Sequence, residues 1–133
     1  MDHAIDLRIF RLTQSILNDL SYNWKIEEMA AEFDITPQHF QKLFKREIGI
    51  PPIAWLHDQR LEKFAKLLLT TYQPIKVIGF KVGLTNASHL TCDFKKKFGF
   101  TPTGYRKHHA EIEQMEAQLE KSKTKMDRND CFG

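Results

Sequence analysis

Residues 36–49 read TPQHFQKLFKREIG, and residues 86–99 read NASHLTCDFKKKFG, at an offset of 50 positions (86 against 36). Each segment opens on a residue that caps helices well, Thr36 or Asn86, and closes on a glycine, which can end a helix at low cost. Pro37 suits the first helical position. The apolar residues in both segments recur every four positions: Phe40, Phe44 and Ile48, and then Leu90, Phe94 and Phe98. This period indicates one buried helix face, so the two segments predict the same amphipathic helix twice.

A shorter helix is predicted before each of these segments. Apolar residues lie at i, i+3, i+4 and i+7 in both copies, 49 positions apart (75 against 26): Ile26, Met29, Ala30 and Phe33, and then Ile75, Ile78, Gly79 and Val82. A turn follows each helix, at residues 34–36 and 83–86. Gly83 can adopt the left-handed conformation that closes a helix, and Asp34 can adopt it less comfortably. A helix, a short turn and a second helix, repeated once, predict two helix-turn-helix units.

Three further helices complete the predicted all-α fold. Residues from about 3 to 20 carry apolar side chains on one helix face: Ile5, Ile9, Leu12, Ile16 and Leu20. Pro51-Pro52 begins a long helix to about Thr71, whose apolar residues spread over more than one face, as expected for a helix between two subdomains. Thr101-Pro102 caps a short closing helix that runs through Arg106. Beyond it the polar tail, with a weak apolar stripe of Ile112, Met115 and Leu119, is predicted to be helical to about Lys121 and frayed after it.

These elements predict five segments along the chain. The N-terminal helix of the first subdomain takes residues 1–20, and the first helix-turn-helix takes residues 21–50. The central linker helix takes residues 51–72, the second helix-turn-helix with its closing helix takes residues 73–107, and the polar C-terminal tail takes residues 108–133.

Composition and charge restrict the class of protein. The chain has 133 residues, 41% of them hydrophobic and 28% charged, which is ordinary for a globular protein of one compact domain or two very small ones. No apolar run approaches a membrane span, the first residues do not resemble a signal peptide, and Cys92 and Cys131 make no disulfide framework. Residues 1–107 carry a net charge of +5 (16 basic, 11 acidic) and residues 108–133 a net charge of −2 (4 basic, 6 acidic). The basic excess suits a polyanionic partner.

No motif in the sequence supports catalysis. The six histidines are scattered, and the chain has no HExxH, no CxxC and no phosphate loop with GK followed by Ser or Thr. His108, His109 and Glu111 favour a solvated helix end over a metal site. We therefore expect no enzyme, no catalytic or metal-binding residues and no cofactor.

The basic excess and the two helix-turn-helix units favour nucleic-acid binding. The alternative is a helical protein-interaction module whose basic face binds an acidic partner, with the tail as a segment through which two copies associate.

Several segments together resemble the AraC/XylS family of bacterial transcription regulators. The resemblance lies in residues 40–49 (FQKLFKREIG), in Arg60-Leu61 with Ala65 and Leu68-Leu69, in residues 74–83, and above all in residues 88–106 (SHLTCDFKKKFGFTPTGYR). It implies a seven-helix, homeodomain-like fold of two helix-turn-helix subdomains joined by the long central helix. It also implies a sequence-specific regulator that inserts two recognition helices into successive major grooves of double-stranded DNA, with RNA polymerase as a candidate partner. The implied location is the bacterial cytoplasm, at the nucleoid.

The chain departs from the family pattern at three positions. Gly79 stands where the family usually has alanine, which lowers helix propensity by about 1 kcal/mol and predicts a softer second unit. Asp34 stands where the family often has glycine, and Leu84 where it often has phenylalanine. Little precedes the first helix, so the chain resembles either a small stand-alone member or a fragment of a longer regulator.

Helix periodicity predicts the DNA-reading residues of both recognition helices, and the resemblance implies the same residues for the first. In the first recognition helix the expected base readers are Gln38, Gln41 and Lys42, which lie opposite the apolar face, together with His39. Glutamine can pair with adenine and lysine can donate to guanine in the major groove. In the second recognition helix the corresponding set has less capacity for hydrogen bonding: Ala87, Ser88, His89 and Cys92. The expected phosphate contacts are Thr36, Lys45, Arg46, Lys95 and Lys96.

Two hypotheses follow from this asymmetry and from the spacing of two reading helices on one chain. The first unit is expected to set sequence preference, and the second mainly to add affinity. Major-groove segments on one DNA face recur about every 34 Å, so closer helices would require a DNA bend costing about 1–6 kcal/mol. Because both helices belong to one chain, the domain alone is expected to bind as a monomer to an asymmetric site. Trp24 and Trp55 are expected to pack in the core or a loop and not to stack on bases.

Overall fold

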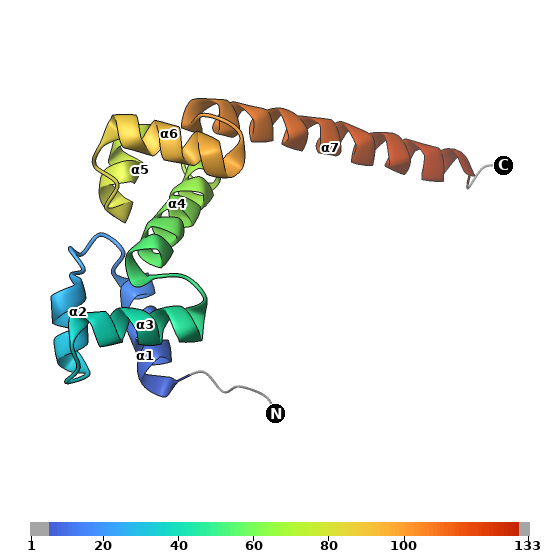
Figure 1. Ribbon diagram of the computed structural model, residues 1–133. Helices are drawn as coiled ribbons and strands as arrows, with labels where there is room; N and C mark the ends of the chain where they lie inside the picture. Colours follow the sequence, from blue (N-terminus) through green and yellow to red (C-terminus); the bar gives the residue numbers. More distant parts are fainter. Residues whose placement is uncertain (1–5, 131–133) are drawn as a thin grey trace. The chain divides into compact units, whose positions relative to one another are not determined.

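A computed structural model describes residues 6–130 of the chain, with side chains through residue 122. The described range contains seven helices and no strand, which confirms the predicted all-α fold (Figure 1). Their bounds are α1 Leu7–Asn18, α2 Ile26–Glu32, α3 Pro37–Ile48, α4 Pro52–Thr70, α5 Ile75–Val82, α6 Ala87–Phe98 and α7 Pro102–Asp130. Contacts divide the chain into two compact units, Met1–Leu90 and Thr91–Gly133.

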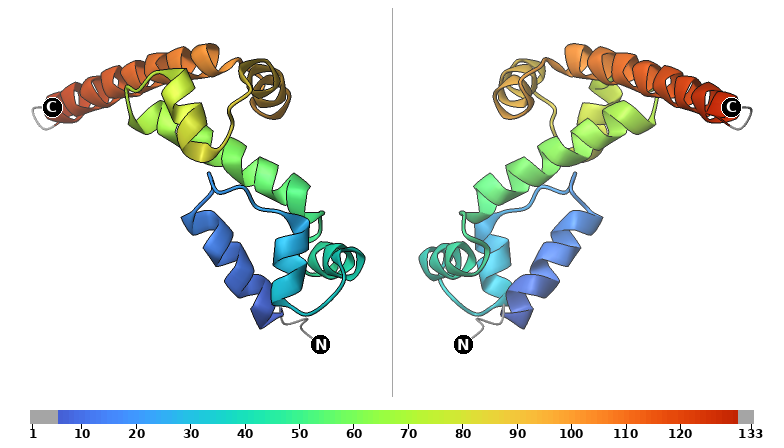
Figure 2. Two further views of the ribbon diagram at one scale, coloured as in Figure 1. Left: turned by 90° about the vertical axis from the view of Figure 1, so that its left-hand side faces the viewer. Right: turned by 90° about the vertical axis from the view of Figure 1, so that its right-hand side faces the viewer.

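The first three helices surround one hydrophobic cluster. Figure 2 shows them as a group, with α3 seen along its axis beside α2. Phe40 and Phe44 of α3 are fully buried, and their rings continue into Phe33 on one side and Trp55 on the other, with centroids 5.6–6.0 Å apart. Trp24 packs against the same cluster and donates its indole N–H to the carbonyl of Asp19 at 2.8 Å. Both tryptophans therefore serve packing, as predicted.

The first helix is shorter than its hydrophobic pattern predicted. It starts at Leu7 because the side chain of Asp6 caps it, accepting a hydrogen bond from the backbone N–H of Arg8 at 2.9 Å. The hydrogen bond from the Arg8 side chain lowers the pKa of Asp6. Ile9, Leu12 and Ile16 form the predicted buried face. Leu20 is also buried but lies beyond the helix end at Asn18, and Ile5 lies outside the described residues.

The turn between α2 and α3 places a non-glycine residue in the left-handed region. Asp34 has φ +55°, and within the described part of the chain it is the one residue other than glycine with positive φ. Left-handed backbone crowds the Cβ of an L-residue, so this turn is strained. The prediction that Asp34 adopts the left-handed conformation after α2 is confirmed.

Replacing Asp34 with glycine should therefore stabilise the protein. Removing the Cβ relieves the strain, although the added freedom of the unfolded chain offsets part of the gain. We expect a rise of about 0.5–1 kcal/mol in the free energy of unfolding, measured by urea denaturation. The Asp34→Ala variant keeps the Cβ and is the control. Equal stabilisation by alanine would show that the carboxylate, and not the backbone conformation, is the source of the effect.

The long helix α4 packs on two sides within the first unit. Its amino-terminal part places Leu56 in the cluster of α1 to α3. Farther along, Phe64 and Leu68 are buried, as are Ile78 and Val82 of α5, against which α4 packs. This explains why its apolar residues spread over more than one face.

Arg60 links α4 to the loop that follows α1. Its Nε donates to the carbonyl of Leu20 at 2.8 Å, and its Nη2 donates to the carbonyl of Tyr22 at 2.9 Å. Burial lowers the pKa of the Arg60 guanidinium, which still remains charged at neutral pH. Gly83, which ends α5 with φ +87°, lies so close that a Cβ there would be 3.0 Å from Arg60 Nε and 3.2 Å from the Leu20 carbonyl oxygen. Any side chain at residue 83 would therefore press against the Arg60 guanidinium and the Leu20 carbonyl group.

Gly79 has a packing reason that helix propensity does not reveal. The N–H of Leu84 donates to the Gly79 carbonyl at 2.7 Å, which brings the turn after α5 back over the helix. A Cβ on residue 79 would lie 2.7 Å from the carbonyl oxygen of Leu84, a backbone atom that cannot move without opening the turn.

Gly79→Ala is consequently expected to destabilise the protein, whereas propensity alone predicts a gain of about 1 kcal/mol. The expected loss is about 1–3 kcal/mol, typical of overpacking at a buried site. Thermal unfolding followed by circular dichroism measures it. An increase in melting temperature would mean that the turn relaxes freely and that propensity dominates.

The second compact unit, which is not the same as the second helix-turn-helix, is built from the carboxyl-terminal part of α6 and from α7. Phe94 is fully buried, and its ring lies 4.5 Å from Phe98 and 5.2 Å from Tyr105. Thr101 caps α7 as predicted, accepting from the N–H of Gly104 at 3.1 Å. The backbone then stays helical to Asp130, so the predicted end of the closing helix near Arg106 and the predicted helix limit near Lys121 are both wrong.

The composition of α7 explains its length. Residues 105–130 contain neither glycine nor proline and are rich in glutamate, glutamine, lysine and methionine, all strong helix formers. None of the described helices is long and apolar enough to cross a membrane.

Candidate nucleic-acid interface

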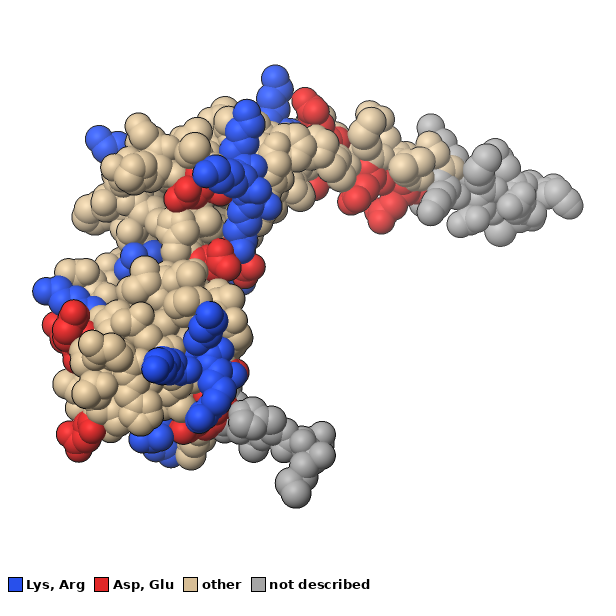
Figure 3. Space-filling model, viewed as in Figure 1, with Lys and Arg blue, Asp and Glu red and all other residues tan. Residues whose placement is uncertain are grey.

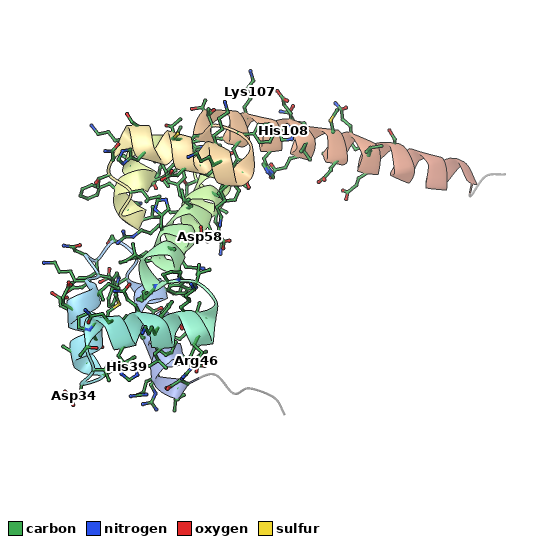
Figure 4. All side chains as sticks on the ribbon, in the orientation of Figure 1. Asp34, His39, Arg46, Asp58, Lys107 and His108 are labelled. Atoms are coloured by element: carbon green, nitrogen blue, oxygen red, sulfur yellow. The ribbon has the colours of Figure 1, made fainter. Side chains whose placement is uncertain are left out.

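The helix α3 separates an apolar face from a polar one. Phe40, Leu43 and Phe44 are buried. The predicted site residues of this segment are all exposed: Thr36, Gln38, His39, Gln41, Lys42, Lys45 and Arg46. Because an α-helix has 3.6 residues per turn, those at 38, 42 and 45 lie opposite the core, with 41 on one flank and 39 and 46 on the other. Figure 4 shows His39 and Arg46 along the same edge of the helix.

The start of α3 is fixed by local bonds. Thr36 has extended backbone, and its hydroxyl accepts from the N–H of His39 at 3.2 Å, while Pro37 occupies the first turn. The hydroxyl proton of Thr36 can still donate to a phosphate. The helix ends at Gly49, with φ +104°. The Thr36 cap and Pro37 therefore fix where α3 begins, and with it the positions of Gln38 and Gln41 on the helix.

The helix α6 repeats this arrangement. Asn86 caps it, because its side-chain oxygen accepts from the N–H of His89 at 3.0 Å, and Gly99 ends it with φ +83°. The predicted residues of this helix are all exposed: Ala87, Ser88, His89, Cys92, Lys95 and Lys96. Ser88, Cys92 and Lys95 stand at the positions that Gln38, Lys42 and Lys45 hold in α3.

One exposed residue of this face was missed from the sequence. Thr91 stands 50 positions after Gln41 and is exposed, so it occupies the same flank of α6 that Gln41 occupies in α3. The repeat offset itself was the signal that could have found it. Its hydroxyl can both donate to and accept from a base edge or a phosphate.

Basic side chains gather on both recognition helices. Figure 3 shows them over the carboxyl-terminal half of α3 and, in the second unit, at the carboxyl end of α6. They include Lys45 and Arg46 in the last turn of α3, and residues 95–97, all lysine, in the last turn of α6. Arg46 Nη2 lies 3.4 Å from Oε1 of Glu47 and forms an ion pair with it, and the Glu47 side chain is only 3% exposed. Lys45 is therefore the more available cation of its pair for a phosphate.

The described residues hold no cluster of three histidine, cysteine, aspartate or glutamate side chains that could bind a metal ion. The ring of His108 stacks on Phe100 with centroids 4.7 Å apart, and that of His109 lies 4.5 Å from Tyr105. These two histidines therefore extend the aromatic packing of the second unit. Cys92 is an exposed free thiol, and Cys131 lies outside the described residues.

Two capped helices, each following a short helix and a tight turn, and each exposing a polar, basic face, define a tandem helix-turn-helix domain. Residues 29–108 match the model of a helix-turn-helix domain family. The chain belongs to the AraC/XylS family of DNA-binding domains, as the following relatives bear out.

The arabinose operon regulatory protein of Escherichia coli is 31% identical over 103 residues, which are 77% of this chain and 35% of that protein. The C-terminal domain of AraT, a response regulator from Geobacillus stearothermophilus, is 31% identical, with a TM-score of 0.72 over 80% of this chain and 88% of that one. The DNA-binding domain of AdpA, solved in complex with a target DNA, shares the fold, with a TM-score of 0.72 at 22% identity over 77% of this chain and 92% of that one. The chain thus spans about a third of the length of the full-length curated relatives that it matches.

Proposed function

We propose that this chain is a sequence-specific DNA-binding transcription regulator, or the DNA-reading part of one. The observation that carries the proposal is the repeated recognition helix: α3 and α6 each bury an apolar face and expose a capped, polar amino-terminal turn followed by cations. Residues near the start of a recognition helix reach base edges in the major groove, and cations farther along meet phosphates. The two helices are proposed to enter successive major-groove segments.

The two helices are proposed to contribute differently to recognition. In α3, Gln38 and Gln41 can pair with adenine, Lys42 can donate to guanine, and His39 adds a further hydrogen-bonding group. In α6, Ala87 can contact a thymine methyl group, and Ser88 and His89 can form hydrogen bonds with bases. Cys92 has little capacity for hydrogen bonding. The first helix therefore sets sequence preference, and the second adds affinity through its lysines. Base changes under α6 should then weaken binding less than base changes under α3.

Lys95 and Lys96 supply the sharpest test of this division. The double variant Lys95→Ala, Lys96→Ala should weaken binding to all duplexes alike, because lysine–phosphate pairs carry no sequence information. The slope of log affinity against log salt should fall by about 1.8, which is about 0.9 for each phosphate that is no longer neutralised. Fluorescence anisotropy at several salt concentrations measures both. Selective weakening for one sequence would assign these lysines to base reading.

Partners and location follow from the same function. Because both recognition helices belong to one chain, a single copy can occupy an asymmetric site. RNA polymerase is the proposed protein partner at a promoter, and the bacterial nucleoid is the proposed location.

The alternative, a basic module that binds an acidic protein, predicts a different result in one experiment. The chain is bound to a fluorescent duplex obtained by selection and challenged with an unlabelled duplex of the same sequence, a scrambled duplex or polyglutamate. The proposal predicts that the selected duplex competes far better than the other two. Equal competition by all three would leave only a polyanion-binding surface.

A further inference from the structure

The outer face of α5 is apolar and uncovered. Ile78 and Val82 on its inner face are buried, whereas Phe80 is 74% exposed and Val77 is 41% exposed. Both line a shallow hollow of about 360 Å³ together with Lys76, Lys81 and Thr85. Exposed aromatic and branched side chains grouped in a hollow are typical of an interaction surface.

Two cations border this apolar pair. With 3.6 residues per turn, Lys76 and Lys81 lie on opposite sides of the strip formed by Val77 and Phe80. Both lysines are exposed, and the Lys81 ammonium donates to the Gln73 side chain at 3.0 Å. The surface, called the α5 groove below, therefore fits an apolar strip that carries negative charge on both edges.

The helix α7 carries such a strip. Met115 is 64% exposed and Leu119 is 60% exposed, and Ile112 lies on the same face. Glu111 and Glu116 are exposed and border this strip, five positions apart like Lys76 and Lys81. Residues 111–122 contain four glutamates and one lysine, a net charge of −3. Figure 3 shows acidic side chains along this helix.

We propose that α7 of one copy of this chain docks in the α5 groove of a second copy. The apolar strips bury each other, and the two glutamates face the two lysines. Charge selects this pairing over its competitors, because α7 against α7 sets glutamates opposite glutamates and α5 against α5 sets lysines opposite lysines. The interaction goes beyond DNA reading by one copy, since it links copies bound at neighbouring sites.

The interface is small, so it is expected to be weak in free solution and strong enough to act when DNA holds two copies close together. A single copy still fills a single site. Two adjacent sites should therefore be filled cooperatively, and the cooperativity should fall with added salt because the flanking charges are exposed.

Complementation between two variants of the full chain tests the proposal. Phe80→Ser removes the groove and leaves α7 intact, while Leu119→Ser removes the strip and leaves the groove intact. Both side chains are exposed, so neither change should unfold the protein. In sedimentation equilibrium, the wild type is expected to gain mass with concentration, and each variant alone should associate at least about tenfold more weakly. An equimolar mixture of the two should recover a dimer, because one intact groove meets one intact strip.

Charge exchange provides the second readout. The double change Lys76→Glu, Lys81→Glu should weaken association, and adding Glu111→Lys and Glu116→Lys in the same chain should restore it, whichever direction the two helices run. Glu113→Lys is the matched control, because residue 113 lies on the opposite side of α7 from the strip. Normal association of Phe80→Ser, with weakening in Leu119→Ser and no recovery in the mixture, would overturn the proposal in favour of α7 pairing with itself. A wild type that stays monomeric at all concentrations would overturn it as well, including the case in which α7 occupies the groove of its own chain.

Discussion

Phe44→Ala is expected to remove a large part of the stability of the first helix-turn-helix. The ring is fully buried and lies between Phe40 and Trp55, with centroid distances of 6.0 and 5.7 Å. Truncating a buried phenylalanine to alanine costs about 3–5 kcal/mol, of a total stability of about 5–15 kcal/mol for an ordinary domain. Urea denaturation followed by circular dichroism should show a large fall in the midpoint.

Phe80→Ala is the matched control, because it removes the same atoms from a side chain that is 74% exposed. Its effect should remain within about 0.5 kcal/mol, as for most surface substitutions. Similar destabilisation in both variants would mean that the ring of Phe44 is not held in a packed core.

The double variant Gln41→Ala, Lys42→Ala is expected to lose most specific DNA binding while it keeps its fold. Both side chains are exposed on α3, and alanine favours the helix. A well-placed side chain that pairs with a base contributes about 1–3 kcal/mol, so removing two should reduce affinity by about 2–6 kcal/mol, or at least about 30-fold. Gel-shift titration with the preferred duplex measures the reduction.

Lys66→Ala is the control for this variant, because Lys66 is exposed on α4 and its replacement removes the same single charge. It should reduce affinity only slightly at physiological salt. If the control loses as much affinity as the double variant, the binding reports net charge and not base pairing by α3 side chains.

Local signals in the sequence were enough to predict the recognition helices. Thr36 and Asn86 cap them, Gly49 and Gly99 end them, and the four-residue apolar period defines their buried faces. Each of these features depends on residues within one or two helical turns of one another, so the local sequence alone is enough to predict them. The exposed sets on α3 and α6 follow from the same period.

The features that the sequence did not reveal depend on residues that lie far apart in the chain or on a turn that has closed. The Arg60 guanidinium meets carbonyls of Leu20 and Tyr22, about forty positions earlier in the chain, and no periodicity encodes such a bond. The close approach of Gly79 to the Leu84 carbonyl oxygen exists only once the turn has closed. Helix propensity therefore predicts that Gly79 destabilises α5, although the folded chain leaves no room for a Cβ at this position.

The length of α7 could have been predicted. The polar composition of the tail favoured an end of the helix near Lys121 with fraying after it, yet the segment up to Asp130 lacks any residue that breaks a helix. Its strong helix formers favour continuation from a start already fixed by the Thr101 cap.

Duplex selection from a random pool shows whether α3 reads DNA sequence. The purified chain and the Gln41→Ala, Lys42→Ala variant are selected in parallel at physiological salt, and the recovered sequences are compared. We expect a motif spanning about two helical turns for the wild type, with the half read by α3 missing or relaxed in the variant. Recovery of the same motif by both proteins, or of no motif by either, would show that Gln41 and Lys42 of α3 do not read DNA sequence.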